Sequence, residues 1–232
     1  MSDDKKTPID DIAPTLFEGA DPKDENPDNW ADAHVTQGND YLQKGEYDSA
    51  EIEYDKALAA KIEELGEANP QVGELRSNLG SCYRHQKRFE LAAEEYIKAI
   101  DIISKALGGE HPHLGDVYNN LGNCLRHLGH PERAIESFKQ GLEIILKTLG
   151  AKHPSVGVGC NNLGNVLRDQ GEKEDAVHFF EKAMMNLSEN FGNDHPYAQR
   201  AMINYFDLAA ELKGVTPQEL IASIQAEMED KN

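Results

Sequence analysis

Apolar residues recur at steps of three and four along most of the chain after about residue 28. Between Leu114 and Leu128 they are Leu114, Val117, Tyr118, Leu121, Cys124, Leu125 and Leu128. This spacing predicts a helix with one apolar face. Gly129-His130-Pro131 interrupts the pattern, and a second helical stripe follows to about Leu149, where Gly150 fits a C-terminal cap. The segment is typical of a helix of about 15 residues, a tight turn, and a helix of about 18.

The same pattern returns every 42 residues. His-Pro pairs begin at His111, His153 and His195, and Asn69-Pro70 occupies the corresponding earlier place. Glycines share this spacing at Gly38, Gly80, Gly122 and Gly164. A fixed period of this length predicts stacked helical units, each packed only on its neighbours, rather than one globular core.

Within each unit, small and large apolar positions also align. The first small position is Ala50, Ala92, Ala134 and Ala176; the large one is Tyr54, Tyr96, Phe138 and Phe180; the second small one is Ala57, Ala99, Gly141 and Ala183. A fifth unit begins at Ala198 and departs from the pattern after Gly214. Thr216-Pro217-Gln218-Glu219 then resembles a capping box, and it predicts a helix to about Glu229 that covers the open end of the stack.

These aligned residues resemble the tetratricopeptide repeat. In the third unit the matching residues are Leu121-Gly122, Leu125, Ala134, Phe138 and Gly141, the last in place of the usual Ala. The 42-residue length, the Asn-Asn-Leu-Gly runs and the Leu-Gly-x-x-His-Pro linkers are similar to the kinesin light chain type of repeat. The resemblance covers roughly residues 30–213. It implies an all-α solenoid of helix-turn-helix repeats in a right-handed superhelix, closed by a C-terminal capping helix.

Three parts are expected along the chain. Residues 1–26 form an acidic tail that contains three prolines and few apolar residues, and this composition predicts disorder. Residues 27–213 form the repeat array, with repeats at about 30–71, 72–113, 114–155 and 156–197 and a partial one at 198–213. Residues 214–232 form the capping helix and the C-terminal tail.

The charge and composition of the chain exclude some classes of binding partner. The net charge is -19 and the mean hydropathy is -0.64, so phosphate backbones and anionic lipids would be repelled. Cys82, Cys124 and Cys160 are odd in number and lack close spacing, which argues against a disulfide framework and a zinc site. Neither a signal region nor an apolar run of membrane-spanning length is found. We therefore expect a cytoplasmic protein, with cytoskeletal association as an option, and no nucleic-acid or membrane partner.

Polar residues that recur every 42 residues, off the apolar stripe, are the candidates for binding. Offsets of four and seven residues place three of these sets on one face of each first helix, and a fourth set lies beside them. In tetratricopeptide proteins the first helices line the concave groove, so the resemblance implies that the sets line it too. The sets are Ser77, Asn119 and Asn161; Asn39, Ser81, Asn123 and Asn165; Arg84, Arg126 and Arg168; and Asn78, Asn120, Asn162 and Asn204.

The chemistry of these side chains suits an extended peptide. An Asn carboxamide offers both a donor and an acceptor to a peptide group, and Arg can pair with carboxylates. An acidic segment is thus the expected ligand, although Glu74 and Asp116 are predicted nearby and would oppose it or pair with the arginines. Two alternatives stay open. The Asn78 set could tie one repeat to the next, and the Arg set could form solvated ion pairs.

No residue set supports catalysis. Phosphate-binding, nucleophile-elbow and dinucleotide-binding sequences are not found. The recurring histidines are expected to cap helices or pack under turns, so no metal or cofactor is predicted. The favoured function is a non-enzymatic protein-binding module, monomeric when free or a subunit of a hetero-complex. The alternative is a structural subunit of a large assembly, cytoskeletal or axonemal, that docks by its convex face or edges and uses Trp30 as a contact. A further hypothesis places Leu16-Phe17-Glu18 of the tail in the groove of its own chain.

Overall fold

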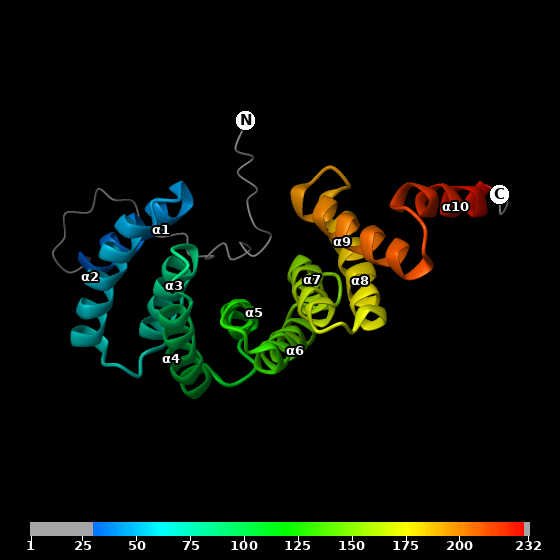
Figure 1. Ribbon diagram of the computed structural model, residues 1–232. Helices are drawn as coiled ribbons and strands as arrows, with labels where there is room; N and C mark the ends of the chain where they lie inside the picture. The colour runs from blue at the N-terminus through cyan, green and yellow to red at the C-terminus, as the bar shows by residue number, and fades with distance from the viewer. Residues whose placement is uncertain (1–29, 230–232) are drawn as a thin grey trace. The chain divides into compact units, whose positions relative to one another are not determined.

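Every regular element in the computed structural model is an α-helix over the residues that it describes, 30–229 (Figure 1). The hypothesis about Leu16-Phe17-Glu18 concerns residues outside this range. The helices are α1 (Trp30–Lys44), α2 (Tyr47–Leu65), α3 (Pro70–His85), α4 (Phe89–Leu107), α5 (Pro112–His127), α6 (Pro131–Thr148), α7 (Pro154–Asp169), α8 (Lys173–Phe191), α9 (Pro196–Lys213) and α10 (Pro217–Glu229). The all-α solenoid predicted from the sequence is confirmed. None of the described helices is both long and apolar enough to cross a membrane.

The described helices divide into two units, with the boundary in the sequence between Thr148 and Leu149. In the first unit, α1 pairs with α2, α3 with α4 and α5 with α6, and α2 packs on α3 as α4 packs on α5. In the second unit, α7 pairs with α8, α8 packs on α9, and α9 contacts α10. Each helix thus packs mainly on its neighbours in sequence, which is the arrangement of a solenoid.

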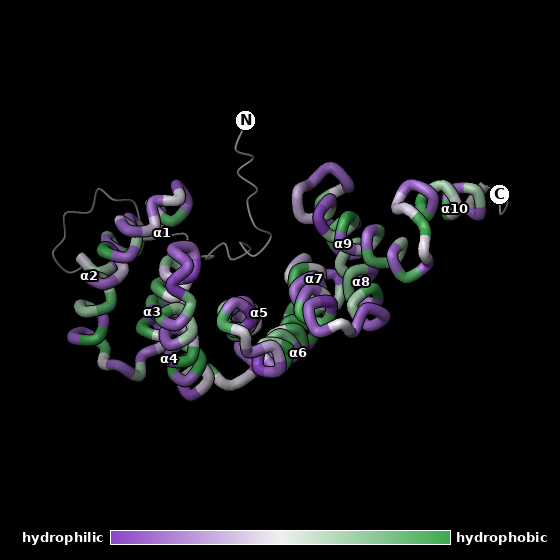
Figure 2. The backbone as a smooth tube through the Cα atoms, in the orientation of Figure 1, coloured by the Kyte–Doolittle hydropathy of each residue, from purple (hydrophilic) through white to green (hydrophobic). Residues whose placement is uncertain are grey.

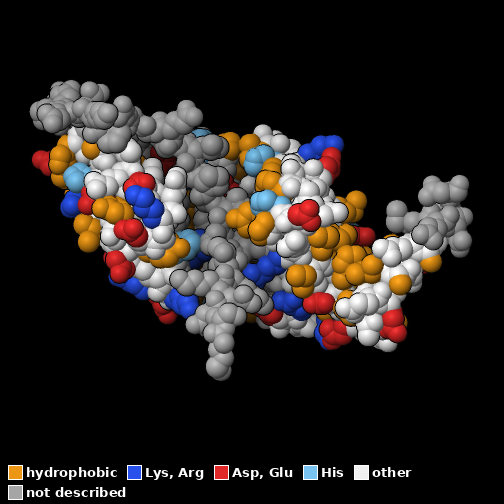
Figure 3. Space-filling view, turned by 90° about the horizontal axis from the view of Figure 1, so that it is seen from above, with side chains coloured by type: hydrophobic (Ala, Val, Ile, Leu, Met, Phe, Trp, Pro, Cys, Tyr) orange, Lys and Arg blue, Asp and Glu red, His pale blue; other side chains and the backbone are white. Residues whose placement is uncertain are grey.

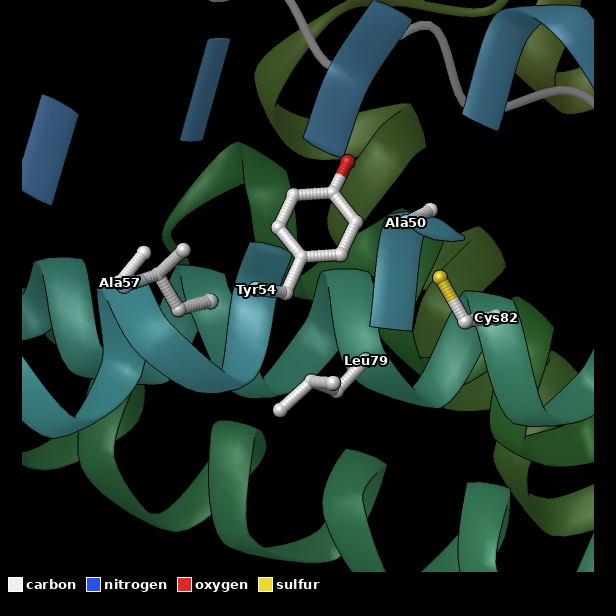
Figure 4. Close-up of a cluster of buried hydrophobic side chains, with 6 residues drawn as sticks. Ala50, Tyr54, Ala57, Leu79 and Cys82 are labelled. Atoms are coloured by element: carbon white, nitrogen blue, oxygen red, sulfur yellow. The ribbon is translucent and has the colours of Figure 1, made fainter. Parts of the chain in front are cut away.

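A buried aromatic ring against a glycine holds each helix pair together. Tyr54, at the centre of the cluster in Figure 4, packs with Ala50, Ala57, Leu79 and Cys82. A Cβ added at Gly38 would lie only 2.7 Å from Cε1 of the Tyr54 ring, so the first helix of the pair has room for nothing larger than glycine there. This close approach explains why the Leu-Gly positions recur with the repeat. The corresponding pairs are Gly80 with Tyr96, Gly122 with Phe138 and Gly164 with Phe180.

Hydrophobic and hydrophilic residues alternate along the individual helices in Figure 2, as expected for helices that bury only one face. Among the side chains of α10 whose burial is described, Leu220 is buried, and it packs with Ala209 and Ala210 of α9. The predicted capping box begins this helix. The Thr216 N–H donates to Glu219 Oε2 at 2.8 Å, and the Glu219 N–H donates to Thr216 Oγ1 at 3.2 Å.

The recurring His-Pro segments begin the first helices of the repeats. His153 Nδ1 accepts from the Ser155 N–H, and His195 Nδ1 accepts from the Tyr197 N–H, each at 3.3 Å. Asn69 caps α3 in the same way. The prediction that the histidines cap helices is therefore confirmed for His153 and His195. The side chain of His111 makes no capping hydrogen bond, so at this residue the other expected role, packing under the turn, stays a prediction.

One contact recurs between successive repeats. The first residue of one repeat's second helix meets the end of the next repeat's first helix. Tyr47 stacks on His85 with ring centroids 4.3 Å apart, and Phe89 stacks on His127 at the same distance. At the corresponding place in the second unit, Lys173 pairs with Glu211 at 2.6 Å. The same two positions of successive repeats are thus in contact in both units. The contact is ring stacking in the first unit and an ion pair in the second.

Candidate functional site

The predicted binding residues lie on α1, α3 and α5 in the first unit and on α7 and α9 in the second. Most of them are buried. Half-buried side chains remain at Asn39, Arg84, Arg126, Asn165, Arg168 and Asn204, whereas the other members of the four sets are buried. The polar atoms of the buried residues must therefore be satisfied inside the protein or by a group that approaches closely.

In the first two repeats, the tyrosine hydroxyl of the second helix hydrogen-bonds to a polar side chain of the first helix. The Tyr54 hydroxyl donates to Asn39 Oδ1 at 2.6 Å. The Tyr96 hydroxyl lies 3.0 Å from Ser81 Oγ, which itself donates to the Ser77 carbonyl oxygen at 3.1 Å. Asn39 and Ser81 are thus engaged within their own repeats.

The third repeat lacks this contact because Phe138 replaces the tyrosine. Asn123 on α5 is 1% exposed, and neither its Oδ1 nor its Nδ2 has a hydrogen-bond partner in the described part of the chain. In the fourth repeat the aromatic residue is Phe180, and Asn165 Oδ1 accepts instead from Arg168 Nη2 at 2.9 Å. Of these four equivalent side chains, Asn123 is the one with both polar atoms unsatisfied.

The set that begins at Asn78 includes a tie between helices. Asn204 Nδ2 on α9 donates to Asn161 Oδ1 on α7 at 2.8 Å, across 43 residues of sequence. This bond corresponds to the alternative role considered for the set, that of joining one repeat to the next. It also engages Asn161, which the sequence assigned to the binding surface. Asn78, Asn120 and Asn162 occupy equivalent buried positions.

The arginines differ in how far the protein engages them. Arg168 donates to Asn165 and also to Asn204 Oδ1 at 3.4 Å, and its guanidinium carbon lies 5.5 Å from the centroid of the Phe180 ring. Arg84 Nη2 lies 3.2 Å from His85 Nε2. Arg126 is half-buried near the end of α5, three residues beyond Asn123. Arg126 and Asn123 are therefore neighbours on one helical face.

Burial raises the pKa of Glu74 on α3, and none of the described arginines acts to lower it. Pairing with an arginine, one of the two roles considered for Glu74, is thus not what sets the pKa of Glu74. Arg76, two residues on, instead pairs with Glu95 of α4 at 2.9 Å, and His34 contacts Glu53 at the same position one repeat earlier. These links between the two helices of a repeat were not predicted from the sequence. The 42-residue alignment could have indicated them, because it places a basic residue and a glutamate at the same two positions of successive repeats.

The remaining histidines show no metal site. Burial and the neighbouring His111 lower the pKa of His113 to about 4. Nδ1 of His111 and Nε2 of His113 are buried without hydrogen-bond partners. Among residues 30–229, however, no group of three or more His, Cys, Asp or Glu side chains could hold a metal ion.

A tetratricopeptide repeat family model matches residues 31–96 and 71–147, and a second tetratricopeptide repeat model matches residues 159–197. No curated protein matches the chain at a significant level. Among solved structures, the chain is similar to BtubC (BKLC) from P. vanneervenii, with 22% identity and a TM-score of 0.71. That likeness covers 88% of this chain and 84% of the other.

The chain is also similar to the kinesin light chain-type protein of Podosopora anserina, which has nearly identical TPR-like repeats. The identity is 20% and the TM-score 0.68, over 90% of this chain and 99% of that one. A point variant of that protein gives 20% identity and a TM-score of 0.67, over 84% and 92% of the two chains. The family models together match more than half of the residues. The chain belongs to the tetratricopeptide repeat family, and its repeats resemble those of kinesin light chain-like proteins.

Proposed function

We propose that this chain is a non-enzymatic protein-binding module that holds an extended, acidic protein segment along the first helices of its repeats. The tetratricopeptide fold is a general scaffold for protein–protein interaction. Asn123 is the observation that carries the proposal. A buried polar group without a partner costs about 1–3 kcal/mol. That cost is offset when a ligand supplies the missing hydrogen bonds.

The neighbouring side chains support the choice of ligand. A carboxamide can donate to a peptide carbonyl and accept from a peptide N–H, so Asn123 suits the main chain of an extended segment. Arg126 lies on the same face of α5, and Arg84 occupies the equivalent place on α3. Guanidinium groups bind carboxylates, which favours acidic residues in the segment. The partner is thus a protein or peptide, not a nucleic acid or a membrane, and no cofactor is required.

A second candidate function is that of a structural subunit in a large assembly. Large apolar side chains are exposed on the second helices: Ile52 on α2 is 55% exposed, Ile97 on α4 is 46% and Met185 on α8 is 63%. Trp30, at the start of α1, is also half exposed, with its ring edge against His34. Such exposed apolar side chains favour contact with another protein through the second helices of the repeats. The kinesin light chain-like repeats suit a cytoplasmic, cytoskeleton-associated assembly.

Affinity capture from native lysate distinguishes the two functions. We would compare the wild type with Asn123→Ala/Arg126→Glu on α5 and with Ile52→Lys/Met185→Lys on the second helices. Loss of the α5 hydrogen bonds and reversal of one charge should weaken a groove ligand by at least about tenfold. The proposal expects the first variant to lose a defined set of proteins while the second retains them. The reverse result would support the structural subunit. Circular dichroism checks that both variants stay helical.

A further inference from the structure

The three repeats of the first unit each have an aromatic residue at the same position. It is a tyrosine in two repeats and a phenylalanine in the third, so the side chains differ by one hydroxyl group. Tyr54, Tyr96 and Phe138 are all buried, and each ring lies against the glycine of the preceding helix. A Cβ added at that glycine would meet the ring Cε1 at 2.7, 2.8 and 2.7 Å respectively. The three rings therefore approach the glycine in the same way, and the hydroxyl is the chemical difference between them.

In the first unit, the polar side chain at the corresponding place of the first helix is bonded in the two repeats whose ring carries a hydroxyl and has no described partner in the repeat whose ring lacks one. Tyr54 donates to Asn39 Oδ1 at 2.6 Å, and Tyr96 lies 3.0 Å from Ser81 Oγ. Phe138 offers no hydroxyl, and the two side-chain polar atoms of Asn123 have no partner in the part that the structure describes. A ligand would have to displace an internal bond at the first two positions and would displace none at the third.

We propose that Phe138 is a specificity-determining residue that leaves Asn123 available to the main chain of a ligand. Tyr54 and Tyr96 hydrogen-bond to the polar side chains at the equivalent positions of α1 and α3. The peptide group of the ligand is therefore bound at α5 rather than at α1 or α3. This inference rests on the proposed binding function and adds the place at which the main chain is read. The ligand group is a peptide amide, because Asn123 can donate to its carbonyl and accept from its N–H.

The fourth repeat provides a matched control. Phe180 occupies the same position and packs against Gly164 in the same way, with ring atoms 2.7 Å from an added Cβ. Asn165 Oδ1, however, already accepts from Arg168. A hydroxyl added at residue 180 therefore meets a carboxamide that is engaged, whereas one added at residue 138 meets a carboxamide with no partner.

The experiment compares Phe138→Tyr with Phe180→Tyr in the full chain. Without ligand, Phe138→Tyr should raise the midpoint of thermal unfolding by a few degrees, since it satisfies a buried carboxamide, and Phe180→Tyr should raise it less. Binding is measured by fluorescence anisotropy with the tightest member of an array of acidic 12-residue peptides. We expect Phe138→Tyr to weaken binding by about tenfold and Phe180→Tyr to change it by less than about twofold.

The reciprocal substitution tests the same idea from the other side. Tyr54→Phe removes the donor to Asn39. It should lower the unfolding midpoint and leave peptide binding at least as tight as in the wild type. Cooperative melting of the variants with added hydroxyls, at midpoints no lower than that of the wild type, would show that the larger side chain is accommodated, as it is at Tyr54 and Tyr96.

The outcomes separate this inference from the proposed function. If the wild type binds an array peptide, Arg126→Glu removes the binding and Phe138→Tyr leaves it within about twofold, the role of Phe138 is wrong and the binding function stands. If no array peptide binds the wild type, the proposed function fails and the role of Phe138 fails with it. Equal weakening by Phe138→Tyr and Phe180→Tyr would also overturn the inference.

Discussion

At the scale of single residues, the partners of buried polar atoms distinguish side chains that are bonded within the protein from candidate binding groups. Asn161 and Arg168 of α7 both bond to Asn204 of α9 and so link these two helices, while Arg168 also bonds to Asn165 within α7. Asn123 occupies the repeat position of Asn165, and neither of its side-chain polar atoms has a hydrogen-bond partner among the described residues. The same residue type in the same repeat position can therefore be bonded to a neighbouring side chain in one repeat and be a candidate binding group in another.

Glu74 gives a prediction about pH. Burial raises its pKa above the usual 4.5, so the folded state binds a proton more tightly than the unfolded state. The stability that this proton binding contributes is present below pH 4.5 and is lost as the pH rises through the raised pKa. Glu74→Gln should therefore raise the unfolding midpoint at neutral pH.

Thermal unfolding at two pH values checks this prediction. The gain from Glu74→Gln should shrink near pH 4, where Glu74 is protonated in the folded state. Glu67→Gln, at an exposed residue of the α2–α3 loop, serves as the control and should have little effect at either pH. An equal gain from Glu74→Gln at both pH values would contradict the ionisation argument.

At the scale of helices, the close approach within each pair depends on glycine opposite an aromatic ring. In the third repeat a Cβ on Gly122 would lie 2.7 Å from Cε1 of Phe138, 2.8 Å from its Cδ1 and 2.9 Å from its Cζ. The ring is buried in the pair and cannot move away without opening the core. The recurrent glycine is therefore a packing requirement of the helix pair.

Gly122→Ala should destabilise the protein by about 1–3 kcal/mol through overpacking. This result would oppose the intrinsic preference, because Ala in a helix interior is favoured over Gly by about 1 kcal/mol. The measurement is urea unfolding followed by circular dichroism. Gly109→Ala is the matched control, since nothing lies within 4 Å of a Cβ added there. Unchanged or increased stability of Gly122→Ala would show that the helices can separate at no cost.

At the scale of the whole molecule, negative charge is in large excess. The chain carries a net charge of -19, while acidic and basic side chains are interspersed on the face shown in Figure 3. Ion pairs between exposed side chains, such as Lys147 with Glu110 at 3.1 Å, contribute little individually. Repulsion within the acidic chain is therefore expected to outweigh them.

Salt should consequently stabilise the protein. Raising the NaCl concentration from about 20 mM to about 300 mM shortens the screening distance from about 20 Å to about 6 Å and weakens the repulsion more than it weakens close pairs. We expect the thermal unfolding midpoint to rise by a few degrees. Sucrose at equal osmolality controls for general solute effects. A midpoint that falls with NaCl would mean that the surface ion pairs contribute more than the net repulsion.

Sequence alone determined the helices, their pairing and the repeat, because the signals that specify them are local. Apolar periodicity, His-Pro helix starts and the Thr216 capping box act over a few residues, and the 42-residue period repeats them. It also placed the candidate side chains on the first helices. Only the tertiary structure decided which of those side chains are already bonded. Asn161 bonds to Asn204 from 43 residues away, whereas the two polar atoms of the Asn123 side chain have no partner among the described residues. The repeat of Asn123 carries Phe138 where the first two repeats carry a tyrosine. Hydrogen bonding depends on distances of a few tenths of an ångström between atoms of different helices, and packing sets those distances.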